Sequence, residues 1–377
     1  MIQIGVVGVL VVFFVAIQRM IYARYWNKDL RANVSFATNA IFEGESGFLQ
    51  EVVENRKSLP LSVVKVKFQT DKHLIFENIQ GSRTTDQYYR NDMFQLGSKE
   101  KLTRTIRFVG GRRGYYTIDS MDLVSMDLFM TRQYVDILPV HTYLYIYPRF
   151  FDSKEFHLSL QQLNGEVLTR RHLLEDPFEH RGIREYQPGD ELKAVNWKAT
   201  AKTGKLKVNQ KNYTSLQSIR IFVNLEDTGI LKKEACVEAS LQICAGLCRF
   251  FLQQGMRVAC YVNGVDVITG HPVALEASSA RGQLGAVLHA LARVDTDKPV
   301  LNFQACFGKR LLQEADGTIT CFVAPNHYQD FLDTVENYHN MGKDYIWFYP
   351  VDEKQDPQLP EFVEKNVRFL HLKGKEK

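Results

Sequence analysis

The sequence has 377 residues, of which 45% are hydrophobic and 24% charged, the ordinary balance of a globular protein. This length accommodates two domains and a membrane anchor. The formal net charge of +4 is too small to indicate a nucleic-acid-binding protein, which would present a strongly basic face. Six cysteines, all in the C-terminal half and without a C-x-x-C pair, are typical of a reduced interior, although Cys244 and Cys248 lie one helical turn apart and leave a metal or redox role open.

The N-terminus begins with an almost uninterrupted apolar run over residues 2–17. Met20 and the two residues after it can extend this run toward the roughly 20 residues that a membrane span needs, if Arg19 reaches the headgroups. No basic segment precedes the run and no small-residue cleavage site follows it, which argues against a secretory signal. We therefore predict a transmembrane helix over residues 1–24, with the alternative of an amphipathic or buried helix.

The charges beside this helix predict its orientation. Four basic residues follow the apolar run, against one acidic residue, Asp29. The positive-inside rule then places the N-terminus outside and the rest of this single-pass protein in the cytoplasm, at the cell membrane. Three aromatic residues are expected to form a belt at the membrane interface, namely Tyr22, Tyr25 and Trp26.

Residues 33–148 read as an all-β domain. Alternating or β-branched runs at 34–37, 47–54, 62–68, 101–108, 114–121 and 142–147 are separated by turn residues. This number of short strands in about a hundred residues predicts a β-sandwich of immunoglobulin-like type. The following stretch, 150–175, is mixed in composition and is expected to be a solvated connector; its basic cluster at 169–172 leaves a binding patch as the alternative.

Residues 178–210, FEHRGIREYQPGDELKAVNWKATAKTGKLKVNQ, hold the densest set of special residue types in the chain. Gln187 to Asp190 is turn chemistry, and Asp190 is expected to be the N-cap of a short helix that carries Trp197. Gly204 is expected to end that helix, and a strand follows at 206–208.

From residue 218 onward, strands and helices alternate. Strands are predicted at 219–225, 257–263, 317–324, 345–350 and 367–372, with helices at 231–254, 279–294 and 328–341. This alternation predicts a parallel sheet with helices on both faces over residues 149–377. The chain as a whole is thus expected to be a multidomain α+β protein.

The signature positions between 181 and 208 resemble those of a bacterial family known as "domain of unknown function 58". The resemblance rests on Arg181-Gly182, Arg184, Tyr186, Pro188-Gly189-Asp190, Asn196-Trp197-Lys198, Ala201 and Leu206 to Val208. Weaker similarity extends into the first domain, at 54–61 and 113–129. The family has no established chemistry.

The resemblance implies a fold and a partner. The implied fold of the second domain is von Willebrand factor A-like, and the implied partner is a MoxR-type AAA+ ATPase encoded in the same gene cluster, together with other membrane proteins. Domains of that fold hold Mg²⁺ in a D-x-S-x-S loop after the first strand. Here the loop reads Asn224 to Gly229 and departs from that motif, yet Glu226, Asp227 and Thr228 offer oxygen atoms to a hard cation. Helix capping by Asp227 or Thr228 is the competing interpretation.

The central stretch is open to three readings. It could be a structural brace in which Trp197 and Tyr186 are buried and Arg181 and Arg184 pair with nearby acids. It could be a partner-docking surface, in which lysines surround one tryptophan. A polyanion site is the third reading, but the acids at Glu179, Glu185, Asp190 and Glu191 weaken the positive field. The residues expected to bind a partner or brace the domains are Arg181, Arg184, Tyr186, Gly189, Asp190, Trp197, Lys198, Lys202 and Lys207.

Three functional hypotheses follow from these readings. The first is a membrane-anchored, cytoplasm-facing adaptor that works with the ATPase to assemble or remodel a membrane complex, without enzymatic activity, cofactor or nucleic acid of its own. The second is a divalent-metal-dependent binding domain. The third is an unrecognised hydrolase, although the sequence contains no H-E-x-x-H, G-x-S-x-G or Walker motif.

Overall fold

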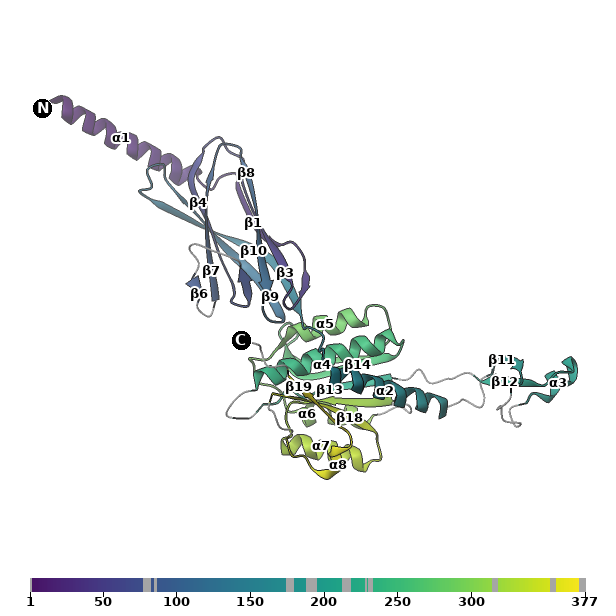
Figure 1. Cartoon of the computed structure of the whole chain (residues 1–377). Coiled ribbons are helices and arrows are strands. Elements are labelled where there is room, and N and C mark those ends of the chain that lie inside the picture. The colour runs from purple at the N-terminus through teal and green to yellow at the C-terminus, as the bar shows by residue number, and fades with distance from the viewer. Residues whose placement is uncertain are drawn as a thin grey trace. The chain divides into compact units, whose positions relative to one another are not determined.

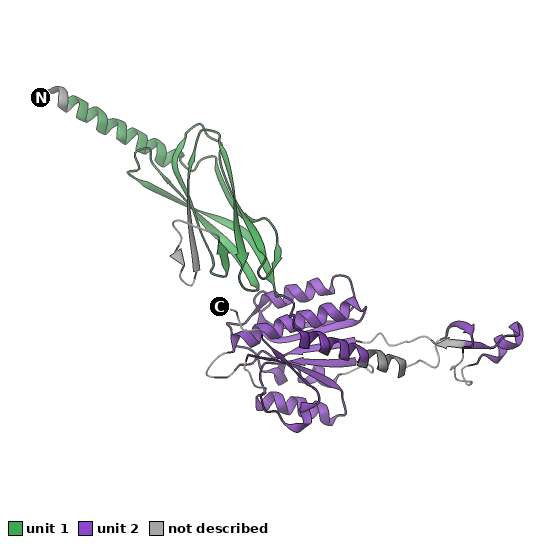
Figure 2. Cartoon of the chain, viewed as in Figure 1, with its two compact units in different colours: residues 1–149 green, residues 150–377 purple. Residues whose placement is uncertain are grey.

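The structure is a computed structural model of the whole chain, which describes residues 2–76, 83–84, 87–173, 180–187, 195–211, 218–227, 229, 233–313, 318–352 and 357–372. The chain divides into two compact units, Met1–Arg149 and Phe150–Lys377 (Figure 2). Each unit is described by itself below.

The first unit begins with a long apolar helix, α1 (Ile2–Tyr25). Its segment Val6–Tyr25 is long and apolar enough to cross a membrane, and only 11% of that segment is buried. A second helix, α4 (Glu234–Gln253), meets the same length and composition criteria but is 67% buried in its own unit. The burial identifies α4 as a core helix, and α1 is the candidate membrane span.

The last two turns of α1 belong to the sandwich and not to a membrane interface. Tyr22 and Trp26 are only 3% and 5% exposed, inside the same core cluster as the strands. The Tyr22 hydroxyl donates a hydrogen bond to the Pro60 carbonyl at 2.9 Å, and the Trp26 ring stacks on Tyr134. The predicted aromatic belt is therefore wrong for these two residues, because their rings gain more by covering the end of the sandwich. Tyr25, at 42% exposure, is the member that stays accessible.

Ten strands follow α1 in the first unit (Figure 1). They are β1 (Leu30–Phe36), β2 (Ala40–Phe42), β3 (Ser46–Asn55), β4 (Leu61–Asp71), β5 (Leu74–Phe76), β6 (Arg83–Thr84), β7 (Gln87–Leu96), β8 (Lys101–Gly110), β9 (Gly114–Met126) and β10 (Gln133–Tyr147). One sheet has the order β1-β3-β8-β5, and the other has the order β2-β10-β9-β4-β7-β6.

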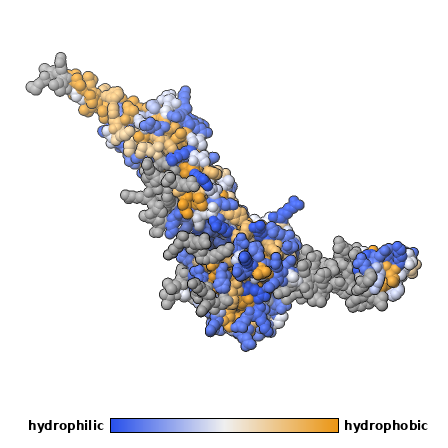
Figure 3. All heavy atoms as spheres, in the orientation of Figure 1, coloured by the Kyte–Doolittle hydropathy of each residue, from blue (hydrophilic) through white to orange (hydrophobic). Residues whose placement is uncertain are grey.

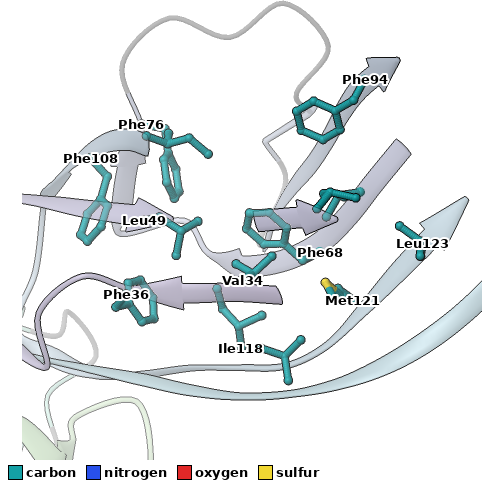
Figure 4. Packing of buried hydrophobic residues seen from close by; sticks show 14 of the residues in the cluster. Val34, Phe36, Leu49, Phe68, Phe76, Phe94, Phe108, Ile118, Met121 and Leu123 are labelled. Carbon is teal, nitrogen blue, oxygen red and sulfur yellow. The ribbon is translucent and has the colours of Figure 1, made fainter. Parts of the chain in front are cut away.

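The two sheets share one apolar core, which Figure 4 shows from close by. Leu49 and Phe108 come from the four-stranded sheet, Phe68 and Ile118 from the six-stranded sheet, and all four are 4% exposed or less. Strand β3 alternates strictly between inward and outward residues, as a half-buried strand should. Burying each such side chain contributes roughly 1.5–3 kcal/mol. The predicted β-sandwich is confirmed, with more strands than the sequence patterns indicated.

The second unit is an α/β body with a seven-stranded sheet. Its elements are α2 (Lys154–Leu173), β11 (His180–Glu185), α3 (Trp197–Thr203), β12 (Lys207–Lys211), β13 (Ser218–Val223), α4, β14 (Arg257–Asp266), β15 (Pro272–Ser278), α5 (Gln283–Arg293), β16 (Val294–Asp295), α6 (Phe303–Leu312), β17 (Thr318–Val323), α7 (Gln329–Asn340), β18 (Tyr345–Val351), α8 (Glu361–Glu364) and β19 (Val367–His371). The sheet order is β15-β14-β13-β17-β18-β19, with β16 paired to β14.

The sheet is mixed, whereas a parallel one was predicted. Strands β13, β14, β17, β18 and β19 pair in parallel, but β15 and β16 both pair antiparallel to β14. The short connection between β14 and β15 explains the direction of β15, because a few residues permit a hairpin and not a crossover.

Helices cover both faces of the sheet. Helices α2, α4 and α5 lie on one side and α6, α7 and α8 on the other (Figure 1). The connector predicted at 150–175 is in fact largely helix α2, whose Phe156, Leu160 and Leu163 are 4% exposed or less. Its Phe156 ring meets Phe348 of β18 at 6.1 Å between centroids, so α2 is part of the core on the α4 side. The side chains of the basic cluster at 169–172 lie outside the described residues.

Candidate functional site

The sheet of the second unit has a topological switch point between β13 and β17. The chain leaves β13 through α4 to β14 on one side, and later enters β17 on the other side of β13. In open α/β sheets the carboxyl ends of two such strands border a crevice, because their following loops turn in opposite directions. The residues after β13 and β17 are therefore the place to look for a ligand site.

A cleft of about 340 Å³ lies at this point. Glu226, Asp227 and Lys233 contribute from the β13–α4 connection, and Tyr349 contributes from β18. The segment after β17 supplies the remaining wall, Pro325, Asn326, His327, Tyr328 and Gln329. Glu226 and Asp227 were predicted from the sequence, whereas the wall after β17 was not, although the predicted end of that strand at residue 324 pointed to it.

Two buried asparagines hold the β13 loop in place. The Asn224 side-chain oxygen accepts hydrogen bonds from the Glu226 backbone N–H at 3.0 Å and from the Asn263 amide at 2.8 Å. Asn263 also accepts from the Leu225 backbone N–H at 2.8 Å and donates to Leu301. Asn224 and Asn263 are both fully buried. Asn224, which the family resemblance places where a metal-binding Asp would stand, thus fixes the loop conformation and offers no charged oxygen.

The carboxyl groups of Glu226 and Asp227 are also engaged with the protein. Glu226 accepts a hydrogen bond from the Phe303 backbone N–H at 3.3 Å, and burial raises the pKa of this glutamate. Asp227 accepts from the backbone N–H of Lys233 at 2.6 Å, from the backbone N–H of Gly229 and from the Tyr328 hydroxyl. Asp227 therefore fixes the segment before α4, while the N-cap position itself is Lys233 and has no side-chain cap. Thr228 lies outside the described residues.

The contacts of this loop argue against a cation site. A hard dication needs several free oxygens that converge on one point, whereas Asn224 Oδ1, Glu226 Oε1 and both carboxylate oxygens of Asp227 already accept hydrogen bonds. Titration of the protein with Mg²⁺, Mn²⁺ and Ca²⁺ in a calorimeter is therefore expected to give no heat beyond dilution. A saturable heat that disappears in a Glu226→Gln variant would contradict this expectation.

The wall of the cleft opposite Glu226 and Asp227 has a pair of neutral hydrogen-bonding side chains. His327 Nδ1 and the Tyr349 hydroxyl lie 3.0 Å apart. Burial, and then the positive charge of Lys233, lowers the pKa of His327, so the imidazole is neutral near pH 7. The arrangement can bind a small polar ligand through neutral donors and acceptors.

A second cluster of reactive side chains lies inside the core of the same unit. Among the described residues, Cys244, Cys248 and Cys260 are the group of three potential metal ligands whose ligand atoms lie within 4.8 Å of one another. The sulfur atoms of Cys244 and Cys260 are 3.4 Å apart, and all three side chains are fully buried. Complete burial among apolar residues is the environment of cysteines that act as small hydrophobic side chains.

Residues 180–187 and 195–211 form a small lobe, called here the hairpin lobe. Strands β11 and β12 pair antiparallel, and Val195 forms a bridge with Val208. These two valines are 6% and 4% exposed and are the buried apolar pair of the lobe. The predicted helix begins later than expected, because Val195 is drawn into this bridge.

Helix α3 is capped at both ends by local side-chain and backbone chemistry. Its N-cap is Asn196, which accepts from the Ala199 N–H at 2.9 Å, and not the predicted Asp190. Gly204 ends the helix in the left-handed conformation, at φ 67°, as the sequence predicted. Gly189 and Asp190 lie outside the described residues.

The lobe exposes most of its characteristic side chains. No residue of α3 is buried, and Trp197 is 66% exposed, so this ring is not part of a buried core in the described lobe. The reading in which Trp197 braces the domains stays a prediction. Lys198 and Lys202 are exposed on the same short helix, and Tyr186 is half-buried. Two further apolar residues of the lobe are also exposed, Ile183 at 53% and Leu206 at 43%.

The charges of the lobe are partly paired. Glu185 lies 3.2 Å from the Lys207 ammonium and 3.6 Å from that of Lys205, and the Lys207 hydrogen bond lowers the pKa of Glu185. The Arg184 guanidinium donates to the Glu185 backbone carbonyl, and the ion pair predicted for Arg184 stays a prediction. Arg181 lies in β11, but its side chain is outside the described part. Among the described residues, Lys198 and Lys202 make no ion pair.

Residues 182–302 match the model of the family described as "Protein of unknown function DUF58". The chain carries a DUF58 region. This region spans the hairpin lobe and continues through β13, α4, β14, β15 and α5, so it includes Glu226 and Asp227. It ends before β17, and the His327 side of the cleft lies beyond the matched residues.

Other comparisons add little to the DUF58 assignment. None of the curated proteins compared with the chain matches it. Among solved structures, the chain is similar to a CARDB domain from Pyrococcus furiosus, with 16% identity, 30% of this chain and 87% of that chain covered, and a TM-score of 0.21. It is also similar to a non-cellulosomal cohesin from Archaeoglobus fulgidus, with 12% identity, coverage of 34% and 97%, and a TM-score of 0.22. Scores this low support no conclusion about function.

Proposed function

We propose that this protein is a membrane-anchored adaptor without catalytic activity, whose hairpin lobe docks a protein partner. The observation that carries the proposal is the 66% exposure of Trp197 on a helix that has no buried residue. Exposing a large aromatic ring to water is unfavourable, and tryptophan is the side chain most enriched among the residues that dominate binding energy. In this role Trp197 would insert into a pocket of the partner.

The surroundings of Trp197 fit such an interface. Exposed Ile183 and Leu206 provide further apolar area in the lobe, and Lys198 and Lys202 provide a cationic rim. An apolar centre with a polar rim is the usual anatomy of a protein–protein interface. The charges favour a partner with an acidic surface, since complementary potentials accelerate encounter and exclude wrong partners.

Two features support the membrane anchor and its orientation. Helix α1 supplies the span, and the basic residues after its apolar run favour a cytoplasmic location for the rest of the chain. All six cysteines are free thiols, which fits the reducing cytoplasm. The strand–helix order of the second unit, with β13 central and a cleft at its carboxyl end, supports a von Willebrand factor A-like assignment of that body.

The family resemblance suggests which protein the partner is. A MoxR-type AAA+ ATPase is the proposed partner, and the proposed role is to present or anchor this ATPase at a membrane complex that it assembles or remodels. The resemblance supports this choice through gene association, and the exposed tryptophan of the lobe supports the docking mode.

A binding measurement with the purified ATPase tests the proposal. The full-length protein in nanodiscs is expected to bind the ATPase from the same genome, and Trp197→Ala is expected to weaken binding about 30-fold, which corresponds to the roughly 2 kcal/mol of an interfacial hot spot. Surface plasmon resonance gives both dissociation constants. Leu158→Ala, which truncates a residue that is 59% exposed on α2, is the matched control and should bind like the parent protein.

Two outcomes would contradict the proposal. If the parent protein does not bind the ATPase, the partner is wrong. If it binds but Trp197→Ala binds equally well, the hairpin lobe is not the docking site. A variant in which Lys198 and Lys202 are both replaced by Gln separates the contribution of the charges from that of Trp197. It should slow association and leave dissociation nearly unchanged.

A further inference from the structure

The turn between β9 and β10 carries three consecutive large apolar residues at its tip. Leu128, Phe129 and Met130 are 46%, 47% and 58% exposed. A contiguous exposed patch of this kind on a water-soluble surface is unfavourable and marks a contact with another apolar phase. We therefore expect another apolar phase to cover the exposed side chains of residues 127–132, called here the β9–β10 turn.

The β9–β10 turn packs directly against α1. The Phe129 ring meets the Phe14 ring edge-on, with 6.3 Å between centroids. Gln18 donates from its amide to the Asp127 carboxylate at 2.8 Å and accepts from the Leu128 backbone N–H at 3.3 Å. These contacts hold the tip of the turn beside the apolar part of α1. Figure 3 shows the apolar surface of α1 in orange, up to the place where the helix meets the sandwich.

The contacts also fix the depth of the turn along α1. Phe14 precedes Arg19 by five residues, which is about 7–8 Å along a helix axis. Gln18 and Tyr22 are buried in the first unit while Met20 and Ile21 between them stay exposed, so the stretch of α1 that precedes these contacts is residues 2–17. That part measures about 24 Å, less than the roughly 30 Å of a hydrocarbon core. A membrane that takes up this helix in full must also take up the residues beside Phe14.

The backbone of the turn is prepared for an apolar environment. Several of its N–H groups are satisfied within the protein: Met130 donates to the Asp127 carbonyl at 2.9 Å, and Thr131 and Arg132 donate to the Asp127 carboxylate at 2.6 and 2.9 Å. Irregular backbone is tolerated near lipid only when its polar groups have internal partners. The Asp127 side chain itself is fully buried under the turn.

Basic and aromatic groups stand at the base of the turn, where headgroups would lie. The Arg19 guanidinium donates to the Thr131 hydroxyl at 3.2 Å, and its side chain is 47% exposed. The Arg132 guanidinium lies over the Tyr134 ring, 5.8 Å from its centroid. Cationic and aromatic side chains just below an apolar tip are the pattern of proteins that insert into one leaflet of a membrane.

We propose that the β9–β10 turn inserts Leu128, Phe129 and Met130 among the acyl chains of the leaflet that α1 enters from the sandwich side. The turn is then a second membrane contact that lengthens the short span and fixes the tilt of the sandwich against the bilayer. This inference rests on the membrane anchor of the proposed function, and it is independent of the hairpin lobe and of the ATPase.

Depth-dependent fluorescence quenching tests the insertion. The full-length protein carrying Phe129→Trp is reconstituted in vesicles of phosphatidylcholine and phosphatidylglycerol, with or without bromine on the acyl chains. The variant is expected to lose more of its fluorescence to brominated lipid than the parent chain, whose three tryptophans set the baseline. Phe48→Trp is the matched control: Phe48 is 45% exposed on β3, toward the opposite end of that strand from Asn55, which pairs with Leu30 just after α1.

The outcomes separate this inference from the anchor. Extra quenching of Phe129→Trp, with Phe48→Trp quenched like the parent, supports insertion. Equal quenching of both variants, while the protein resists extraction by alkaline carbonate, overturns the insertion and leaves the anchor standing. Release of the protein by carbonate overturns the anchor and the insertion together. Near-parent circular dichroism of both variants confirms that they fold.

Discussion

Alanine in place of Trp347 is expected to lower the free energy of unfolding of the α/β unit by about 3–5 kcal/mol, the usual loss for truncating a large buried aromatic side chain. Trp347 is fully buried on β18, where its ring packs against Phe331 of α7 and Tyr349. Its indole N–H donates to the Ala324 carbonyl at 3.2 Å, at the start of the cleft wall after β17. Urea unfolding followed by circular dichroism at the helical band measures the change.

The two other tryptophan substitutions provide controls. Trp197→Ala makes the same chemical change at an exposed position and is expected to alter stability by less than about 0.5 kcal/mol. Trp347→Phe keeps most of the ring contacts but removes the donor to Ala324, so we expect a loss of about 1–2 kcal/mol. If Trp347→Ala were as mild as Trp197→Ala, the packing of α7 against β18 would not be the core described here.

Asparagine in place of Asp127 is expected to have the second largest effect, a loss of about 2–3 kcal/mol from the first unit. The buried Asp127 carboxylate accepts hydrogen bonds from Gln18, the Thr131 hydroxyl and two backbone N–H groups. An asparagine amide would turn two donor hydrogens toward these donors. Because Gln18 belongs to α1, the change is also expected to loosen the helix from the sandwich, which hydrogen exchange of α1 in detergent would detect.

The same carboxylate predicts a pH dependence of stability. Burial alone would raise the pKa of Asp127, but hydrogen bonds from Thr131, Arg132 and Gln18 outweigh it and lower the pKa to about 2. The ordinary value is 3.8, so the unfolded chain binds this proton more readily. The stabilisation, on the order of 2 kcal/mol, is therefore fully present above about pH 4 and is lost as the pH falls toward 2.

Melting temperatures between pH 2 and 5 check this step. The parent protein should lose stability through that window more steeply than Asp127→Asn, which lacks the titrating group. Asp119→Asn, at an exposed position of β9, is the matched control and should follow the parent curve. Parallel curves for the parent and Asp127→Asn would show that another carboxyl group causes the acid loss.

Local patterns in the sequence predicted the elements that have strong periodicity. The strands at 219–225, 317–324 and 345–350 correspond to β13, β17 and β18, because continuous apolar runs bounded by turns are specific for buried strands. Helix α2 was not predicted, because many polar residues separate its buried apolar residues Phe156, Leu160 and Leu163. Only packing against the sheet makes that helix stable.

The candidate site divides in the same way. Trp197 and its lysines were recognised from residue types at close spacing, and Glu226 and Asp227 from their place after a predicted strand. The opposite wall of the cleft, with Asn326, His327 and Tyr349, is formed by segments about a hundred residues further along the chain, and no local signal connects them to Glu226. Their proximity follows from the pairing of β13 with β17.

Short-range patterns were sufficient to predict an apolar N-terminal helix, a β-rich first part, an α/β second part and the DUF58 resemblance, because each depends on periodicity or residue type within a short window. Long-range packing was needed to show that Tyr22 and Trp26 are buried in the sandwich core, that Trp197 is exposed, and that the β9–β10 turn lies beside Phe14. Burial depends on which distant surfaces meet, and a side chain of given hydrophobicity can be covered by a core, by a partner or by lipid.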